Sequence, residues 1–172
     1  MRRREIGKGL VASVLWGLST SWAQPRRPSG PVLFTPQDAE MLRLSDEEWT
    51  SSRRPESMQT RAISLGPRIV FQMPHIRETS AGPTLETSTP MVLLVVFEER
   101  GAAVDMQSLR VQARKGIFSK SLTETLQPYV RGTRVEAQEV QVPEGRFLIQ
   151  IDIADLQGRK TSEAYRLEVK KL

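Results

Sequence analysis

Apolar residues recur at every second position over residues 66–172 of this 172-residue chain. Ile69, Phe71 and Met73 lie two apart, and Pro74 closes the run. The same spacing returns toward the C-terminus, in Phe147, Ile149, Ile151 and Ile153 and then in Tyr165, Leu167 and Val169. Because successive side chains of a strand point to opposite faces, this period predicts strands with one dry and one wet side. Met73 is in phase with Ile69 and Phe71, so we expect it in the core.

The run Met91–Phe97 departs from this alternation, since all of its residues are apolar. Its length and its β-branched residues predict a buried strand rather than a helix. One face of such a strand belongs to the core, and the other face must also be covered. We expect a helix within Met41–Trp49, or a partner chain, to cover it.

Turn residues divide the region into about seven short strands. Residues 75–89 are polar and contain a Gly-Pro pair, which predicts a long loop. Asp155–Gly158 predicts the turn of a hairpin, with Gly158 in the left-handed conformation. Asp152 and Asp155 flank this hairpin, where aspartate is common because its side chain stabilises turns.

Two irregularities are expected before that hairpin. The apolar phase slips between Ala137 and Val140, which predicts a bulge or a bend near Gln138-Glu139. Ser121–Glu124 has the pattern of a capping box, so we expect a helix of one or two turns that Pro128 limits.

The number and length of these strands predict an all-β fold. About seven strands over roughly 105 residues are typical of an immunoglobulin-like antiparallel β-sandwich, here preceded by a short helical segment. The phrases at Thr89–Phe97, Gly101–Val111 and Pro143–Arg159 resemble those of small bacterial exported proteins with a single immunoglobulin-like domain. The resemblance covers roughly residues 66–170. It implies the fold, says almost nothing about function and carries over no catalytic residue.

The first 23 residues have the three parts of a cleavable signal peptide. Met1–Lys8 is basic, Gly9–Leu18 is apolar, and Ser21 and Ala23 occupy the small-residue positions before Gln24. The apolar run is shorter than the roughly 20 residues that span a bilayer. We therefore expect cleavage after Ala23, no stable membrane span after signal removal, and a periplasmic or secreted protein. The general secretory route is favoured, and the adjacent arginines leave the twin-arginine route open.

Residues 24–65 are expected to form a linker with a short helix around residues 36–49. Thr35 before a proline, and Ser45 with a glutamate three residues later, are signals of a helix start. Two interpretations of the apolar residues in this segment stay open. They belong either to a motif that folds on docking to a partner or to a flap packed on the sandwich; the residues are Met41, Leu42, Leu44 and Trp49.

Charge gives little reason to expect a nucleic-acid partner. The chain has 25 basic and 20 acidic residues, and the predicted signal peptide removes four basic residues and one acidic residue. The processed chain thus holds 21 basic and 19 acidic residues, a net charge near +2. Nucleic-acid binding requires a strong one-sided basic field, so the expected partner is another envelope or secreted protein.

Side chains that could support catalysis or hold a cofactor are scarce. The chain has one histidine, His75, and no cysteine, which excludes disulfides and thiol chemistry. It also lacks a Gly-x-Ser-x-Gly nucleophile turn and a glycine-rich phosphate loop. We therefore expect neither an enzyme nor a bound cofactor. His75 beside Met73 is a weak candidate metal ligand, since these residue types bind copper, and a loop histidine without a ligand is the simpler interpretation.

The sequence favours an exported, non-enzymatic immunoglobulin-like module that binds an unknown partner through a sheet face, a loop or an edge strand. The alternative is a periplasmic carrier of copper or of another small ligand.

Overall fold

The structure is a computed structural model that describes residues 30–52 and 65–171. The predicted signal peptide, residues 1–23, lies outside the described residues together with its cleavage site. Residues 24–29 and 53–64 of the predicted linker lie outside them as well. Within the described ranges, no helix is long and apolar enough to cross a membrane.

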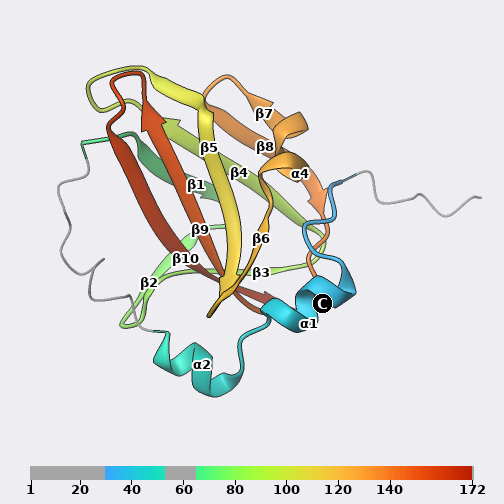
Figure 1. The fold of residues 1–172 in the computed structure, drawn as a ribbon. Helices are drawn as coiled ribbons and strands as arrows, with labels where there is room; N and C mark the ends of the chain where they lie inside the picture. The colour runs from blue at the N-terminus through green and yellow to red at the C-terminus, as the bar shows by residue number, and fades with distance from the viewer. Residues whose placement is uncertain (1–29, 53–64, 172) are drawn as a thin grey trace, which may run out of the picture.

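Ten strands of the described chain form two sheets (Figure 1). The smaller sheet has the order β1 (Arg68–Met73), β4 (Met91–Glu98), β8 (Arg134–Val140) and β7 (Val130–Arg131). The larger has the order β2 (Ile76–Thr79), β3 (Gly82–Ser88), β10 (Lys160–Lys170), β9 (Gly145–Asp155), β5 (Val104–Lys115) and β6 (Phe118–Ser121). Neighbouring strands run antiparallel, apart from the parallel pair β3 and β10. The protein is an all-β, immunoglobulin-like sandwich, which confirms the predicted fold class.

Four of the ten strands were not predicted: β3, which lies in the predicted loop over residues 75–89, and the three short strands β2, β6 and β7. β2 and β6 have four residues each and β7 has two, and all three lie at sheet edges. A strand of that length places at most two side chains on each face, so alternation gives almost no signal for it. Each of the other seven strands has at least six residues.

The prediction of a long loop over residues 75–89 is wrong. β2 and β3 form a hairpin there, and β3 pairs with β10 from Thr84 to Ser88. The polar composition is misleading because this edge hairpin turns most of its side chains outward. Leu85 and Thr84 are the buried residues of β3.

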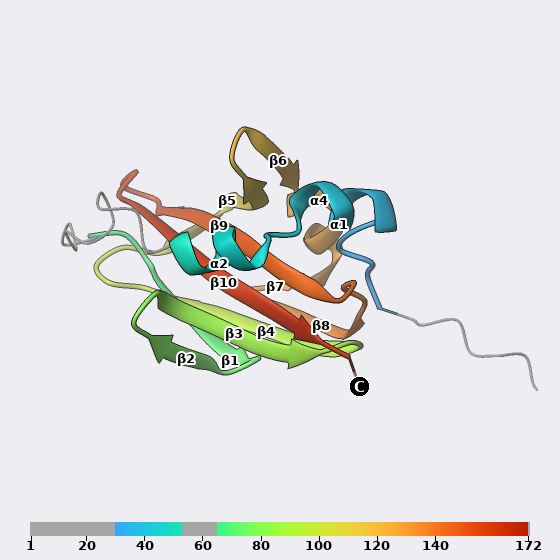
Figure 2. The same cartoon turned by 90° about the horizontal axis from the view of Figure 1, so that it is seen from below.

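β4 has an inner and an outer face, although both are apolar. Met91, Leu93, Val95 and Phe97 are buried between the sheets, whereas Val92, Leu94 and Val96 are half-buried on the outer side. The Met41–Trp49 segment does not cover this outer side, contrary to expectation. Of its helices, α1 (Pro36–Leu42) packs Ala39 and Leu42 into the core, and α2 (Asp46–Ser51) lies on the outer face of the six-stranded sheet, where Trp49 contacts Arg146 and Arg166 (Figure 2).

The predicted bulge and hairpin are both confirmed. The register of β4 against β8 shifts between Met91 and Leu93, and Glu139 opposite this step has a φ of 51°. β9 and β10 form the long hairpin, with Gly158 at a φ of 77° in its turn.

The predicted capping box at Ser121 does not form. Ser121 is the last residue of β6, and helix α4 (Thr123–Leu126) follows Leu122 without a side-chain cap. The Thr123 hydroxyl instead accepts a hydrogen bond from the Val111 backbone N–H at 2.9 Å. The helix still ends as expected, in the 3₁₀ turn Gln127–Tyr129 that contains Pro128.

The segment before the sandwich contributes to its core. Leu33, Phe34, Ala39 and Leu42 are buried, and the Phe34 ring stacks on that of Phe147 at 4.8 Å. Backbone hydrogen bonds join Leu33 to Gln141 at 3.0 Å and Gln141 to Pro31 at 2.8 Å. The residues predicted as linker therefore include a part that is packed as tightly as the strands.

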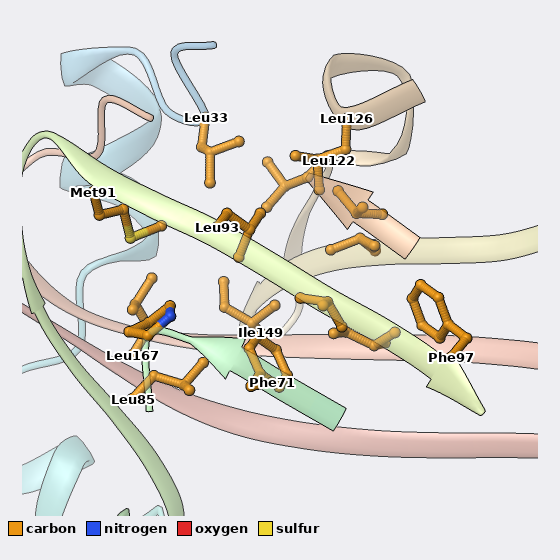
Figure 3. A pocket seen from close by; sticks show the side chains of 15 residues that line it. Leu33, Phe71, Leu85, Met91, Leu93, Phe97, Leu122, Leu126, Ile149 and Leu167 are labelled. Carbon is orange, nitrogen blue, oxygen red and sulfur yellow. The ribbon is translucent and has the colours of Figure 1, made fainter. Parts of the chain in front are cut away.

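A small apolar cavity of about 50 Å³ lies between the two sheets (Figure 3). Leu33 from the N-terminal segment and Leu122 and Leu126 around α4 close one side, opposite Phe71 and Leu85 (Figure 3). No polar side chain lines it among the residues that the structure describes. A cavity of this kind remains dry, because a water molecule there would have no hydrogen-bond partner.

Candidate functional site

Both helices of the N-terminal segment begin at the predicted residues, and both have a capping box, which the sequence predicted at Ser45. The Thr35 hydroxyl accepts from the Asp38 N–H at 3.1 Å, and the Ser45 hydroxyl accepts from the Glu48 N–H at 3.1 Å. The two carboxylates reach back to the N-cap N–H groups, at 3.2 and 2.8 Å. The hydrogen bond with the Thr35 side chain lowers the pKa of Asp38, and the bond from the Ser45 backbone lowers that of Glu48.

Ion pairs attach these helices to the β5–β6 hairpin. The Lys115 ammonium lies 3.1 Å from Glu48 and donates to the Arg43 carbonyl at 2.7 Å. Lys120 lies 3.2 Å from Asp38. Both helices are therefore held next to the β5–β6 hairpin, α1 through Lys120 and α2 through Lys115.

Trp49 anchors α2 to the middle of the sheet. The guanidinium carbons of Arg166 and Arg146 lie 3.8 and 5.4 Å from the centre of its ring. Arg166 is only 6% exposed and donates to the Trp49 carbonyl at 2.7 Å. Burial, followed by the charge of Arg146, lowers the pKa of Arg166. Cation–π contacts of desolvated guanidinium groups stabilise by about 2 kcal/mol, so this part of α2 is firmly attached.

An open groove of about 400 Å³ lies between α2 and the strands beneath it. Its lining is mainly apolar, and it includes charged, amide and hydroxyl groups. The lining residues are Leu44, Glu48, Ser51, Ser52, Arg114, Lys115, Gly116, Leu148, Gln150 and Ala164. Binding sites for small or extended ligands combine an apolar surface with a few polar groups in this way.

The turn of the β5–β6 hairpin, where the groove ends, exposes two large apolar side chains. Gly116 lines the groove, and the next residues, Ile117 and Phe118, are 94% and 55% exposed. We call Ile117, Phe118 and the groove the hairpin surface. Sequence reasoning missed it, although a bulky apolar pair directly after the turn glycine at 116 was the signal.

The residues singled out in the N-terminal segment have three different environments. Leu42 is buried in the core, and Met41 beside it is 48% exposed. Leu44 is half-buried and lines the groove, whereas the Trp49 ring is held by Arg146 and Arg166. Met41 is therefore the most exposed of the four, Leu44 and Trp49 are half-buried, and Leu42 is out of a partner's reach.

Met73 and His75 lie at the connection from β1 to β2, and both are exposed. The expectation that Met73 belongs to the core is wrong, because the register of β1 shifts between Phe71 and Met73 and breaks the alternation. Among residues 30–52 and 65–171, no group of three or more His, Cys, Asp or Glu side chains is placed to hold a metal ion.

Asp155 is a buried carboxylate whose hydrogen bonds are all used by its own turn. It accepts from the N–H groups of Gln157 and Arg159 at 2.9 and 3.0 Å, and from Arg159 Nε at 2.6 Å. Burial alone raises the pKa of a carboxyl group, but the hydrogen bonds from Arg159 outweigh it, so the pKa of Asp155 is lowered. This is the turn-stabilising role expected from the sequence.

The Asp155 turn is expected to stabilise the fold in a pH-dependent way. A lowered folded-state pKa contributes stability above the ordinary value of 3.8, and this contribution is lost as the pH falls through the folded-state pKa. Asp155→Asn is therefore expected to be less stable than wild type at pH 7, with a gap that narrows below 3.8. Urea unfolding at pH 7, 5 and 3 measures the gap. If the stability difference between wild type and Asp155→Asn is the same at all three pH values, the charge of Asp155 does not stabilise the fold. Glu99→Gln is the control, because Glu99 is exposed.

The comparisons with known proteins add little to this geometry. The chain matches no protein-family model, and no curated protein sequence resembles it significantly. The solved structures that are similar to it include the following two. One is CopC from Methylosinus trichosporium OB3b, at 9% identity and a TM-score of 0.35, over 61% of this chain and 94% of that protein. The other is murine CRIg, also at 9% identity and a TM-score of 0.35, over 61% of this chain and 98% of that protein. Likeness at this level carries no argument about function.

Proposed function

We propose that the protein is an exported, non-enzymatic immunoglobulin-like module that binds another protein, and that the hairpin surface is its binding site. The observation that carries the proposal is the exposure of Ile117 and Phe118 side by side at the end of an open groove. Large apolar side chains gathered on a surface mark interaction sites more often than scattered ones do.

The surroundings of the pair support a protein partner. An interface needs an apolar centre and a polar rim. Ile117 and Phe118 supply the first, and Ser51, Ser52 and Arg114 in the groove supply the second. The ion pairs from Lys115 and Lys120 to α2 and α1 hold this surface in place before a partner arrives.

The groove offers little for catalysis, which supports a binding role. Its acidic residue, Glu48, caps α2 and pairs with Lys115. Its hydroxyls, from Ser51 and Ser52, hydrogen-bond to backbone carbonyls of α2 itself. None of these groups is arranged as a nucleophile next to a base.

Export to the periplasm or the cell exterior rests on the signal peptide predicted at residues 1–23. The alternative function, a copper carrier, has less support. It depends on His75, which is exposed at the connection from β1 to β2. Met73 is the sulfur-containing side chain close to it in the sequence.

A double substitution tests the proposed site. Ile117→Ser with Phe118→Ser is expected to abolish cross-linking of the protein to its partner in the exported fraction of the native cells. The fold should be unaffected, because exposed substitutions change stability by about 0.5 kcal/mol or less. Mass spectrometry of the cross-linked products provides the measurement.

Leu156→Ser is the matched control, since Leu156 is 72% exposed in the β9–β10 turn. It should retain every cross-link. Equal loss in both variants, or loss in neither, would contradict the choice of the hairpin surface.

A further inference from the structure

β6 forms an open edge of the six-stranded sheet. It is the last strand in the order of that sheet, and all four of its side chains are exposed (Figures 1 and 2). The other edges carry the features that commonly prevent strand addition. β7 has two residues, β1 contains a register shift, and β2 presents Arg77 and Glu78. β6 is as short as β2, but it carries one charged side chain, Lys120, and pairs with β5 without a register shift.

The register shows which backbone groups of β6 face outward. Leu122 N–H donates to the Val111 carbonyl at 2.8 Å, so Leu122 and Val111 form a hydrogen-bonded pair. Hydrogen-bonded and non-hydrogen-bonded pairs alternate along antiparallel strands. Lys120 and Phe118 are therefore also bonded to β5, opposite Ala113 and Lys115. Ser119 and Ser121 turn their N–H and C=O groups away from the sheet.

We propose that β6 binds an extended segment of another protein as an added antiparallel strand, with an acidic residue opposite Lys120. Strand addition rests on the proposed function, and it specifies the sheet edge and the kind of contact through which the partner binds. The outward groups of Ser119 and Ser121 provide up to four backbone hydrogen bonds, as in other cases of β-strand addition. Phe118 and Lys120 lie on the same face of β6, and Ile117 belongs to the turn before it.

Charge favours an acidic partner strand. The hairpin carries Arg114, Lys115 and Lys120 near its turn, and residues 106–123 contain no Asp or Glu. Asp38 and Glu48 lie against it from α1 and α2 and each pairs with one lysine, which leaves Arg114 with Gln150 as its hydrogen-bond partner. These five charged groups sum to +1, and the Lys120 side chain is still 45% exposed beside Asp38, so an incoming carboxylate can reach it.

A second copy of the chain fits this edge less well. The register that uses all outward groups places Ser119 of one copy opposite Ser121 of the other. Lys120 then lies directly opposite its own counterpart, and like charges in that position are destabilising. A strand with glutamate at that place removes this repulsion.

The probe is a blocked peptide, Thr-Val-Glu-Val-Leu-Val, whose glutamate lies opposite Lys120 and whose leucine lies opposite Phe118. We expect it to bind the purified full protein and to shift the amide resonances of residues 117–121. N-methylation of the two valines opposite Ser121 and Ser119 should abolish binding, whereas N-methylation of the glutamate and leucine should be tolerated. A peptide with lysine in place of glutamate should bind more weakly.

Ser119→Pro tests the protein side of the contact. Proline removes the outward N–H and is tolerated in edge strands at such positions, so the hairpin should keep its fold and its melting temperature. The affinity for the peptide should fall roughly tenfold or more, because backbone hydrogen bonds are lost. Ser119→Ala, the matched control, should bind within about twofold of wild type.

Several results would overturn strand addition at β6. These are the absence of binding, equal binding of the valine-methylated peptide, equal binding of the lysine peptide, or a Ser119→Pro variant that binds normally. Sedimentation showing a wild-type dimer that Ser119→Pro dissociates would identify a second copy as the occupant instead. If the native partner still cross-links to Ser119→Pro but not to the Ile117/Phe118 double variant, the proposed function stands and strand addition does not.

Discussion

Phe34→Ala is expected to lower the free energy of unfolding by about 3–5 kcal/mol, the usual effect of removing a buried phenylalanine. Phe34 is almost completely buried and stacks on Phe147 at 4.8 Å, although it precedes the first strand by more than thirty residues. Its loss would leave a cavity against β9 and weaken the attachment of α1. Chemical denaturation followed by tryptophan fluorescence measures the change.

Phe118→Ala is the control for this substitution, since it removes the same ring from an exposed position. It should change stability by about 0.5 kcal/mol or less. A Phe34→Ala protein as stable as Phe118→Ala would mean that residues 30–42 are a dispensable attachment to the sandwich.

Leu122→Ala is expected to cost about 3–5 kcal/mol, in the upper part of the range for buried leucines. Leu122 lines the apolar cavity of about 50 Å³ (Figure 3), so truncation enlarges a void that already exists. The cost of such substitutions increases with the volume of the cavity that remains. Thermal unfolding of the variant and of wild type gives the difference.

The enlarged cavity gives this prediction a second readout. A dry cavity lined by leucine and phenylalanine binds small apolar molecules such as benzene. Benzene should therefore raise the melting temperature of Leu122→Ala and leave that of wild type nearly unchanged. Equal effects on both proteins would show that the site collapses when the leucine is removed. Leu156→Ala, at an exposed turn, controls for the loss of a leucine side chain.

These two substitutions bear on function because they separate the scaffold from the binding surface. Phe34 and Leu122 hold the N-terminal segment and the α4 end of the sandwich, whereas Ile117 and Phe118 contribute little to the core. A variant that unfolds loses every activity. A variant at Ile117 and Phe118 is expected to lose the partner alone, so the two classes of effect are distinguishable by measuring stability beside binding.

The strands that the sequence predicted well are those with a complete alternation or a sharp turn signal. β9 and β10 carry four and three apolar residues in phase, and the slip between Ala137 and Val140 marks a real bulge at Glu139. The β2–β3 hairpin was missed because only Leu85 and Thr84 are buried there. Met73 was misplaced because a register shift cannot be seen from spacing alone.

The candidate site depended on contacts that no local pattern encodes. Arg114, Leu148 and Ala164 come from three different strands, and they meet beneath α2 because the register of β5, β9 and β10 aligns them. The helix starts at Thr35 and Ser45 were predicted from the sequence, the second as a capping box. The places where the two helices pack were not, since those depend on Lys115, Lys120, Arg146 and Arg166.

The sequence by itself determined the fold class, the two helix starts, the main hairpin and the bulge, since each follows from the conformational preferences of residues a few positions apart. The tertiary structure decided which apolar residues are buried, that residues 30–42 belong to the core, and that β6 is left with an open edge. Burial and edge exposure depend on how distant segments pair, and that pairing is fixed by packing and register across the whole sandwich.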